Sequence, residues 1–365
     1  MSILIFFIIL LVLVLVHEFG HFFSAKRFGI RVDEFGFGFP PKLFGKKYGE
    51  TEYSFNLLPI GGFVKIFGEN PDEENTKGPD ASRSFVNKPK WQQAIVLFAG
   101  VFANFLLAWL LFSFGFMSGF PTSVGSEARG YALTDVNLVV LSVLPNSPAE
   151  GAGLQSGDKI ISATSDGNSI SDMNPDILKS FIVAHPGEKI EIGYLRGKEN
   201  LPGLTSIIPE ASEGGTPTIG ISMDQIGTAK LPFFTAFKEG MMLTLFITKS
   251  TAVGLYTLIA DSLRGQGSFA SVTGPVGIVG IVGDAYEFGF IYLLSFTALI
   301  SINLAIINLI PFPALDGGRL FFLLIEKIKG SRINPKVANI ANMVGFVILI
   351  LLMVVVTFHD VIKLF

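Results

Sequence analysis

The sequence contains no cysteine, which excludes a disulfide framework, a thiolate metal ligand and a thiol nucleophile. Charged residues are also scarce: they make up 16% of the 365 residues, whereas a soluble domain typically has about 25%. Half of the residues (50%) are hydrophobic and the mean hydropathy is +0.55, so the chain is predicted to be a polytopic α-helical membrane protein. The formal net charge of -3 argues against a nucleic-acid partner.

Histidine is scarce as well, with 4 in the chain, yet His17 and His21 fall in one HExxH motif inside an apolar run that opens at Ile3. Positions four apart share one face of a helix, so both imidazoles can bind one metal ion. Glu18 lies between them and can accept a proton from a metal-bound water. A charge at the centre of a membrane span costs about 2.5–3.5 kcal/mol, which favours a functional role for these residues.

The N-terminal run lacks a basic segment and a small-residue cleavage site, so we expect a retained first span over about 3–25. Lysine and arginine follow it closely, with eleven of the 27 lying between Lys26 and Lys90. The positive-inside rule places that segment in the cytoplasm and the N-terminus outside.

Two stretches of this cytoplasmic segment predict strands. Residues 32–39 alternate with glycine, and Tyr53–Leu57 and Phe63–Phe67 flank a Pro-Ile-Gly-Gly turn, which predicts a hairpin. We expect a membrane-associated β region over about 32–67, because non-helical backbone at membrane depth must be buried in protein or line a wet cavity. A small soluble hairpin with one apolar face is the alternative. Residues 69–90 are expected to form a solvated loop.

A second span is predicted over about 91–120, and it contains Asn104, a polar side chain that should hydrogen-bond to a neighbour.

The composition then becomes that of a soluble domain over 125–230. The run Ser147–Ile161 predicts a capped short helix, a glycine stop and a Gly-Asp turn into a strand. It resembles the corresponding segment of PDZ domains, and we expect one PDZ-like α+β domain with Pro217–Ser222 as its closing strand.

A third span over about 291–312 leads to Asp316, which follows two prolines and precedes two glycines. Such residues free backbone groups and let a carboxylate be directed from a broken helix end. Asn303 and Asn308 lie in the same span and could hold the backbone of a substrate. A basic loop follows, and the last span is predicted over about 338–358.

The orientation of these spans follows from the metal ligands. His17 and His21 lie near the cytoplasmic end of the first span, and Asp316 can meet them only if the third span also runs from outside to inside. Residues 231–290 must then cross the membrane zero or two times, and we expect an amphipathic segment at the interface. The expected fold has four transmembrane helices, with both termini and the PDZ-like domain outside and the active site near the cytoplasmic side.

Catalytic zinc usually has three protein ligands and one open position for water. His17, His21 and Asp316 supply three such ligands without cysteine, and Glu18 can pass the proton of the water to a leaving amine. The hairpin offers an edge to which an extended substrate can add as a strand. These residues predict hydrolysis of an amide bond with Zn²⁺ as the cofactor.

The whole pattern resembles the site-2 protease family, and in particular its bacterial regulator-of-sigma-E branch. HEFGH, the NLIPFPALDG run that ends in Asp316 and Gly317, and a PDZ-like domain between spans two and three carry the resemblance. It implies zinc ligation by the same three residues, Glu18 as the base, and substrate contacts by a further set: Asn104, Asn303, Asn308, Gly61, Gly62 and Phe63. The first of these belongs to a GxxxN element and the glycines to a membrane-reentrant β-loop.

The resemblance also implies a partner and a location. The substrate would be a single-pass membrane protein already shortened on its outer side, such as an anti-sigma factor or a remnant signal peptide, in the bacterial inner membrane. The PDZ-like domain would bind a peptide or a C-terminus. The best-known member of this branch has two tandem PDZ domains and this chain has room for one, so a size filter built from a pair is in doubt.

Three other functions remain open from the residues. A different membrane HExxH peptidase, of the CAAX-processing type, would take a glutamate as its third ligand, and Glu34, Glu50, Glu52 and Glu69 are available. A non-enzymatic receptor or assembly factor would present its PDZ-like domain outside. A metal transporter is disfavoured by the single HExxH and the short polar path.

Overall fold

A computed structural model describes residues 1–70, 73–124, 131–197, 200–211, 215–265 and 273–362. The chain forms two compact units, which are described separately. Unit 1 comprises Met1–Phe112, Gly240–Gly283 and Ser295–Phe365, and unit 2 comprises Ser113–Glu239 and Asp284–Leu294. Residues 125–130, where the PDZ-like domain was expected to begin, lie outside the described residues.

Within the described residues, 5 helices are long and apolar enough to cross a membrane: α1 (Ser2–Arg27), α3 (Lys90–Ser118), α6 (Phe233–Leu263), α8 (Phe290–Leu309) and α10 (Pro335–Ile362). Four of them coincide with the predicted spans, and α6 comes from the segment expected at the interface. The threonines there do not break the helix, because Thr244 and Thr248 each donate a hydrogen bond to the carbonyl four residues earlier, at 2.7 Å.

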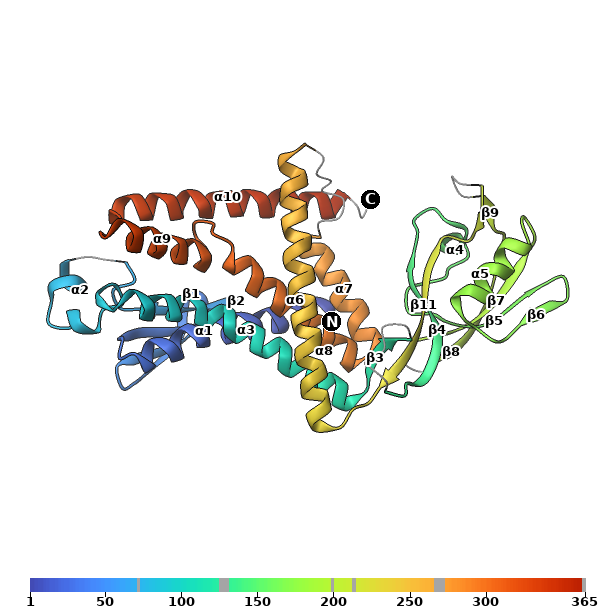
Figure 1. Ribbon diagram of the computed structural model, residues 1–365, viewed down its shortest axis with the longest axis horizontal. Coiled ribbons are helices and arrows are strands. Elements are labelled where there is room, and N and C mark those ends of the chain that lie inside the picture. The colour runs from blue at the N-terminus through green and yellow to red at the C-terminus, as the bar shows by residue number, and fades with distance from the viewer. Residues whose placement is uncertain (71–72, 125–130, 198–199, 212–214, 266–272, 363–365) are drawn as a thin grey trace. The chain divides into compact units, whose positions relative to one another are not determined.

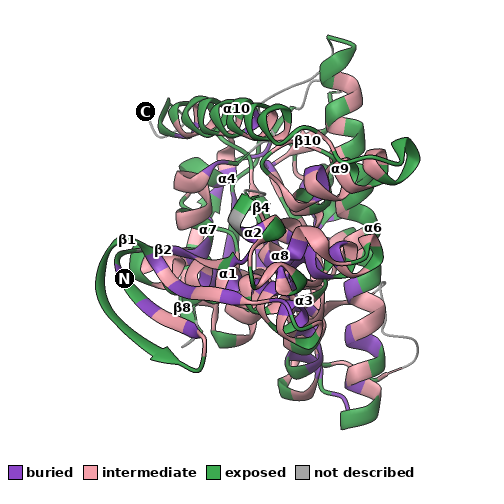
Figure 2. Cartoon of the chain, turned by 90° about the vertical axis from the view of Figure 1, so that its left-hand side faces the viewer, coloured by how far each residue is buried: buried purple, intermediate pink, exposed green. Residues whose placement is uncertain are grey.

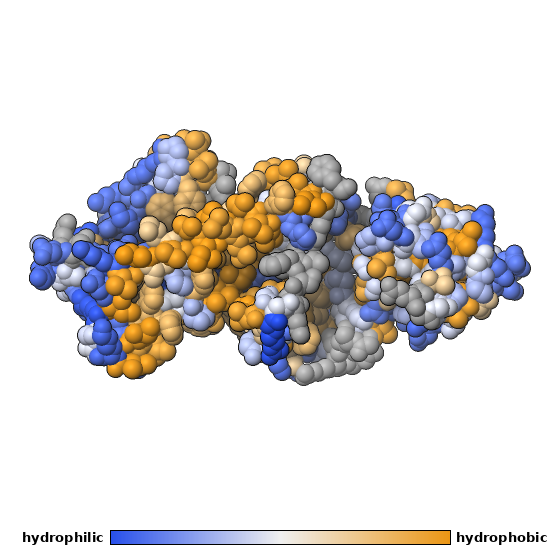
Figure 3. All heavy atoms as spheres, turned by 90° about the horizontal axis from the view of Figure 1, so that it is seen from above, coloured by the Kyte–Doolittle hydropathy of each residue, from blue (hydrophilic) through white to orange (hydrophobic). Residues whose placement is uncertain are grey.

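Within unit 1, α6 and α10 have different directions, and both expose most of their apolar residues. Figures 1 and 2 both show α6 running crosswise to α10. The α10 helix has a largely exposed surface (Figure 2), and its exposed apolar residues include Val347, Leu351 and Val354. Figure 3 shows hydrophobic atoms spread over the middle of unit 1 and hydrophilic atoms gathered at its end. Such a surface is suited to lipid.

The β region of unit 1 differs from the predicted hairpin. Strands β1 (Val32–Tyr48) and β2 (Thr51–Ile66) pair, but each is long enough to fold back on the other. Glu34 is in register with both Lys65 and Glu52, so the first half of β1 lies between the two halves of β2. The Tyr53–Leu57 and Phe63–Phe67 runs are therefore separated by a strand and are not hairpin partners. Alternation predicts a strand but not its neighbour.

Unit 1 also contains several shorter elements: α2 (Glu73–Lys77), the 3-10 turns η1 (Ala81–Arg83) and η2 (Phe85–Asn87), most of α7 (Pro275–Phe288), and α9 (Asp316–Lys329). The expected solvated loop over 69–90 is thus partly structured, and Phe85 is buried in a core with Val96 and Leu97. Lys90 forms an ion pair with Glu326, so the two basic segments predicted to be cytoplasmic meet at one end.

Unit 2 contains a sheet in the strand order β3-β11-β4-β5-β7-β8, with β6 on β5 and a separate β9–β10 pair. Its core is formed by apolar residues of these strands and of two helices. The elements are β3 (Phe120–Ser123), β4 (Thr134–Val143), α4 (Pro148–Gly151), β5 (Lys159–Ser165), β6 (Asn168–Ile170), α5 (Pro175–Ala184), β7 (Ile190–Arg196), β8 (Leu201–Ile207), β9 (Glu210–Ala211), β10 (Pro217–Thr218) and β11 (Ile221–Ala229).

The SPAEGAGLQSGD run folds locally as predicted. Ser147 caps α4 by accepting a hydrogen bond from the Glu150 N–H at 3.3 Å, and Gly153 follows the helix with φ 79°. The fully buried Asp158 accepts two hydrogen bonds from Arg196, at 2.7 and 2.6 Å, and these raise the pKa of the Arg196 guanidinium. The expected closing strand instead divides into β10 and the start of β11.

Candidate metal centre

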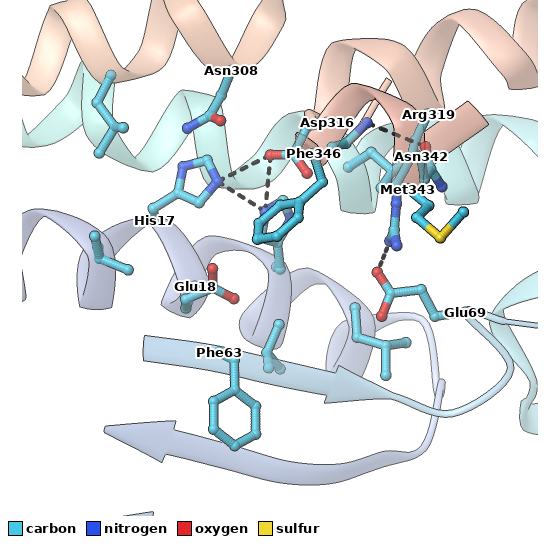
Figure 4. Close-up of a pocket in the computed structure, with 17 residues that line it drawn as sticks. His17, Glu18, Phe63, Glu69, Asn308, Asp316, Arg319, Asn342, Met343 and Phe346 are labelled. Atoms are coloured by element: carbon cyan, nitrogen blue, oxygen red, sulfur yellow. Dashed lines mark hydrogen bonds and ion pairs between the residues drawn. The ribbon is translucent and has the colours of Figure 1, made fainter. Parts of the chain in front are cut away.

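Helix α1 brings its two histidines to one point because they lie one turn apart on its buried face. The Nε2 atoms of His17 and His21 are 3.2 Å apart, and both residues are buried. The Oδ2 atom of Asp316 lies 2.9 Å from Nε2 of His17 and 3.2 Å from Nε2 of His21. Residues 299 positions apart in the chain therefore direct three potential ligand atoms at one point (Figure 4).

Asp316 reaches this point because the chain breaks between α8 and α9. Gly317 and Gly318 pass so close to the carbonyls of residues 309–312 that a side chain on either would collide with backbone. The N–H of Ala314 donates to Oδ1 of Asn342 on α10 at 3.2 Å. These contacts fix the turn that starts α9 with a carboxylate.

Helix α3 packs against the two histidines with three residues of one face. The carbonyl of Val96 accepts a hydrogen bond from Nδ1 of His21 at 2.8 Å, which leaves Nε2 free to bind a metal. A Cβ at Gly100 would lie 2.9 Å from Cε1 of His17 and closer still to Nε2 of His21. Asn104 lies one turn further on, with its Nδ2 at 3.5 Å from Nδ1 of His17.

The donor set suits zinc. Two imidazole nitrogens and one carboxylate oxygen, all within 4.8 Å of one another, match a catalytic zinc site that keeps a position open. Among the described residues, this is a group in which three His, Asp or Glu side chains lie close enough to share one ion. The glutamates that a CAAX-type peptidase could use as a third ligand are each bound to other side chains: Glu34 to Ser54, Glu52 to Lys42, Glu69 to Arg319, and Glu50 to Lys26 and Arg83.

A cavity of about 610 Å³ opens beside the three ligand atoms (Figure 4). Glu18 lines it from α1, Phe63 from β2 and Asn308 from α8. Its volume is that of a small-ligand site and is sufficient for a short stretch of extended peptide. The remaining lining residues come from the same three elements, from α3, α9 and α10, and from the segments that follow β2 and α8: Val14, Val64, Ile66, Glu69, Leu97, Leu304, Ala314, Arg319, Asn342, Met343 and Phe346.

The other predicted site residues lie at different distances from this cavity. Gly62 lies close to α1, because a Cβ there would be 3.1 Å from Cδ2 of Leu15 and in ordinary contact with Cγ of Glu18, and Gly61 adopts φ 85° beside it. Asn303 is half-buried on α8 and is not part of the cavity wall. Asn104 is fully buried behind His17 and is not part of the wall either.

Two charged residues of the wall were assigned elsewhere from the sequence. Arg319 was counted with a basic loop and Glu69 with a solvated one, but they form an ion pair across the cavity (Figure 4). Arg319 follows Asp316 by three residues in α9, so both share a helix face. That spacing is the signal that could have placed Arg319 in the site. Glu69 has no comparable local signal.

A metal centre of this composition, in a unit with helices of spanning length, defines the class of membrane-bound zinc metalloproteases. The sequence pattern of peptidase family M50 matches residues 5–352. The chain is 36% identical over 351 residues to a predicted zinc metalloprotease of Clostridium perfringens, covering 96% of this chain and 95% of that one. It is 30% and 31% identical to the zinc metalloproteases RasP of Geobacillus kaustophilus and Bacillus licheniformis, covering 100% of this chain and 98% and 99% of theirs.

The chain therefore belongs to peptidase family M50, as its resemblance to the site-2 proteases predicted. It is a zinc-dependent protease, and its cofactor is Zn²⁺.

Proposed function

We propose that the protein hydrolyses a peptide bond within the transmembrane segment of a single-pass membrane protein whose outer part has already been trimmed. Substrates of this type include anti-sigma-factor-like proteins and remnant signal peptides. The observation that carries the proposal is the convergence of His17, His21 and Asp316 beside Glu18 in a cavity walled by α1, α8 and α10. All three helices are long and apolar enough to cross a membrane.

Each residue has a distinct role in this reaction. His17, His21 and Asp316 would hold the zinc, which when bound supplies a Lewis acid and lowers the pKa of its water. Glu18 faces the same cavity and would accept the proton of the attacking water and then deliver it to the leaving amine. The apolar wall residues exclude bulk water around this exchange.

The substrate would bind as an added strand. Residues 62–66 of β2 pair with β1 on one side, and Phe63, Val64 and Ile66 of this segment line the cavity. An extended peptide placed there would gain backbone hydrogen bonds, which an unwound transmembrane segment otherwise lacks in lipid. Asn308, on the opposite wall, would bind a further backbone group of the substrate. Asn303 would act only if the substrate extends along α8 beyond the cavity.

We retain the arrangement of four spans, with α6 at the membrane surface. The metal centre lies beside the C-terminal parts of α1 and α8 and the N-terminal part of α3. In this arrangement α1 and α8 therefore cross the membrane in the same direction. A single crossing by α6 would reverse α8 unless the next segment crossed back. The 14 residues of α7 rise about 21 Å, whereas the hydrocarbon core is about 30 Å thick. The crosswise course of α6 in Figure 1 agrees with this arrangement.

With four spans, the sheet of unit 2 would lie outside the cytoplasm. Unit 2 has the strands, the capped α4 and the α5 helix expected of one PDZ-like domain. It would bind a peptide or a C-terminus and thereby select substrates. The basic residues near Lys90 and Arg332, which lie at one end of unit 1, would face the cytoplasm of a bacterial inner membrane.

The test compares the wild type with Glu18→Gln and Asp316→Ala, each reconstituted with a single-pass substrate that has a short outer segment. We expect Glu18→Gln to retain zinc and to lose cleavage by at least about 10²-fold. Asp316→Ala should lose both. Cleavage by Glu18→Gln would remove Glu18 from its role, and full zinc and activity in Asp316→Ala would favour a peptidase with a glutamate ligand. If the His21→Ala variant keeps its full zinc content, the alternative of a non-enzymatic receptor or assembly factor would be favoured.

A further inference from the structure

We propose that Asn104 is a positioning residue for the zinc site: its side-chain oxygen accepts a hydrogen bond from Nδ1–H of His17 and so holds Nε2 of that ring toward the metal. This inference rests on the proposed zinc ligands. It differs from the substrate contact expected from the GxxxN element, because Asn104 is fully buried and is not part of the cavity wall.

The first observation is a buried acceptor without a partner. The Oδ1 atom of Asn104 has no hydrogen-bond partner among the described residues, whereas Nδ2 lies 3.5 Å from Nδ1 of His17. The backbone of Asn104 is fixed, because its carbonyl accepts a hydrogen bond from Oγ of Ser301 at 2.8 Å. In this orientation the amide leaves a buried acceptor unpaired, at a cost of about 1–3 kcal/mol, and meets His17 only through a contact of 3.5 Å.

The second observation is the chemistry of the ring that it faces. An imidazole that binds a metal through Nε2 carries its proton on Nδ1, so the group next to Nδ1 must be an acceptor. The side-chain nitrogen of an asparagine is a donor, and two facing donors remain far apart. The oxygen and nitrogen of an amide occupy nearly equivalent positions, and their assignment follows from the hydrogen bonds they make. Turning the amide over pairs Oδ1 with Nδ1–H of His17 and moves Nδ2 to the position that Oδ1 occupied.

The third observation is that the other histidine is held in this way. Nδ1 of His21 donates to the carbonyl of Val96 at 2.8 Å. Val96, Gly100 and Asn104 are spaced four apart on α3 and therefore lie on one face. Val96 orients one ring, Gly100 gives both rings room, and Asn104 orients the second ring. One face of α3 thus fixes the orientation of both imidazole rings, and Asn104, the polar residue of the GxxxN element, contacts His17 on the side of the ring that faces away from the metal.

The proposal is tested by zinc affinity, measured by chelator competition on the full-length protein in detergent at one pH. Asn104→Ala should bind zinc about 10–100-fold more weakly than the wild type. Asn104→Asp should bind it at least as tightly as the wild type, because an ionised carboxylate only accepts hydrogen bonds. Asn303→Ala, which removes the same amide from α8 outside the cavity wall, is the matched control and should leave zinc affinity unchanged.

Three results would overturn the proposal: wild-type affinity in Asn104→Ala, an affinity in Asn104→Asp as weak as that in Asn104→Ala, or an equal loss in Asn303→Ala. If Asn104→Ala does not fold, Asn104→Asp decides the question alone, because a donating amide could not be replaced by an aspartate. His17→Ala is measured in parallel. Retention of zinc by that variant would contradict the ligand set, and with it both the proposed function and the role of Asn104, whereas loss of zinc there with wild-type affinity in Asn104→Ala would overturn the role of Asn104 alone.

Discussion

Replacing Gly100 with alanine tests whether the packing of α3 against α1 shapes the metal centre. The added Cβ would lie 2.9 Å from Cε1 of His17, whereas ordinary contact begins at 3.4 Å, a shortfall of 3.4 − 2.9 = 0.5 Å. The Nε2 atom of His21 is closer still. The neighbours are imidazole rings held at both ends, by α1 and by the proposed metal, so they cannot swing aside as a flexible chain would.

The size of the effect follows from the tolerance of metal sites. Ligand distances must stay within about 0.2 Å of ideal, and the shortfall is more than twice that. Misplacement of reacting groups by about 1 Å can cost about 10²-fold in rate, so we expect a 10- to 100-fold loss of activity with a parallel loss of zinc affinity. Overpacking should also cost about 1–3 kcal/mol of stability.

The assay measures zinc content, cleavage rate and thermal unfolding on the same preparation. Gly254→Ala is the matched control, because Gly254 lies within α6 with nothing within 4 Å of its added Cβ. That variant carries the same gain in helix propensity without a collision. Full zinc content and a wild-type rate in Gly100→Ala would refute the close approach of α3 to the histidines.

Three further predictions concern charged residues. Arg319→Ala and Glu69→Ala should each lower the cleavage rate, and the double variant should be no worse than the poorer single variant, with a coupling of about 0.5–3 kcal/mol. Arg196→Met leaves the carboxylate of Asp158 buried without its partner, so it should destabilise the PDZ-like domain by about 3–5 kcal/mol in thermal unfolding. Burial would raise the pKa of the Glu50 carboxyl, but the hydrogen bonds from two cations hold it below its ordinary value. Glu50→Gln should therefore lower the free energy of unfolding at pH 7 by at most about 1 kcal/mol, seen as a slightly lower melting temperature, and the difference should vanish as pH falls through the folded pKa.

Each of these has a result that contradicts it. Additive losses in the double variant would show that the ion pair across the cavity has no functional role. An unchanged melting temperature in Arg196→Met would mean that Asp158 finds another partner. A Glu50→Gln difference that grows below pH 4 has the wrong sign, because a carboxylate with a lowered pKa stabilises the fold only while it is ionised.

The convergence of His17, His21 and Asp316 could be predicted from the sequence because its signals lie in short stretches of the chain. The spacing of His17 and His21 fixes their shared face in any helix, and the Pro-Gly break before and after Asp316 marks a helix end. The length and apolar content of the spans, and the capped α4 with its glycine stop, are likewise local properties. Each of these formed where the residues indicated.

The errors concern partners that only the tertiary structure selects. Alternation in residues 53–67 predicts strands, but the first half of β1 enters between them, and no local pattern encodes that pairing. Part of the segment expected at the interface forms α6, a helix of spanning length whose threonines bond to their own backbone. Arg319 counted as a loop charge, because its location in a cavity depends on where Glu69 folds. The sequence places Asn104 in the second span but does not show that its side chain is buried behind His17 and outside the cavity wall.

The most direct test of the central claim is zinc K-edge absorption spectroscopy on the purified protein and its Asp316→Ala variant. The wild type should show two imidazole nitrogens at about 2.0–2.1 Å together with oxygen ligands, one of them from Asp316. The variant should lose zinc, or show a changed oxygen shell at reduced occupancy. An unchanged spectrum at full occupancy in Asp316→Ala would contradict the account, because the carboxylate that begins α9 would then not share a metal with His17 and His21.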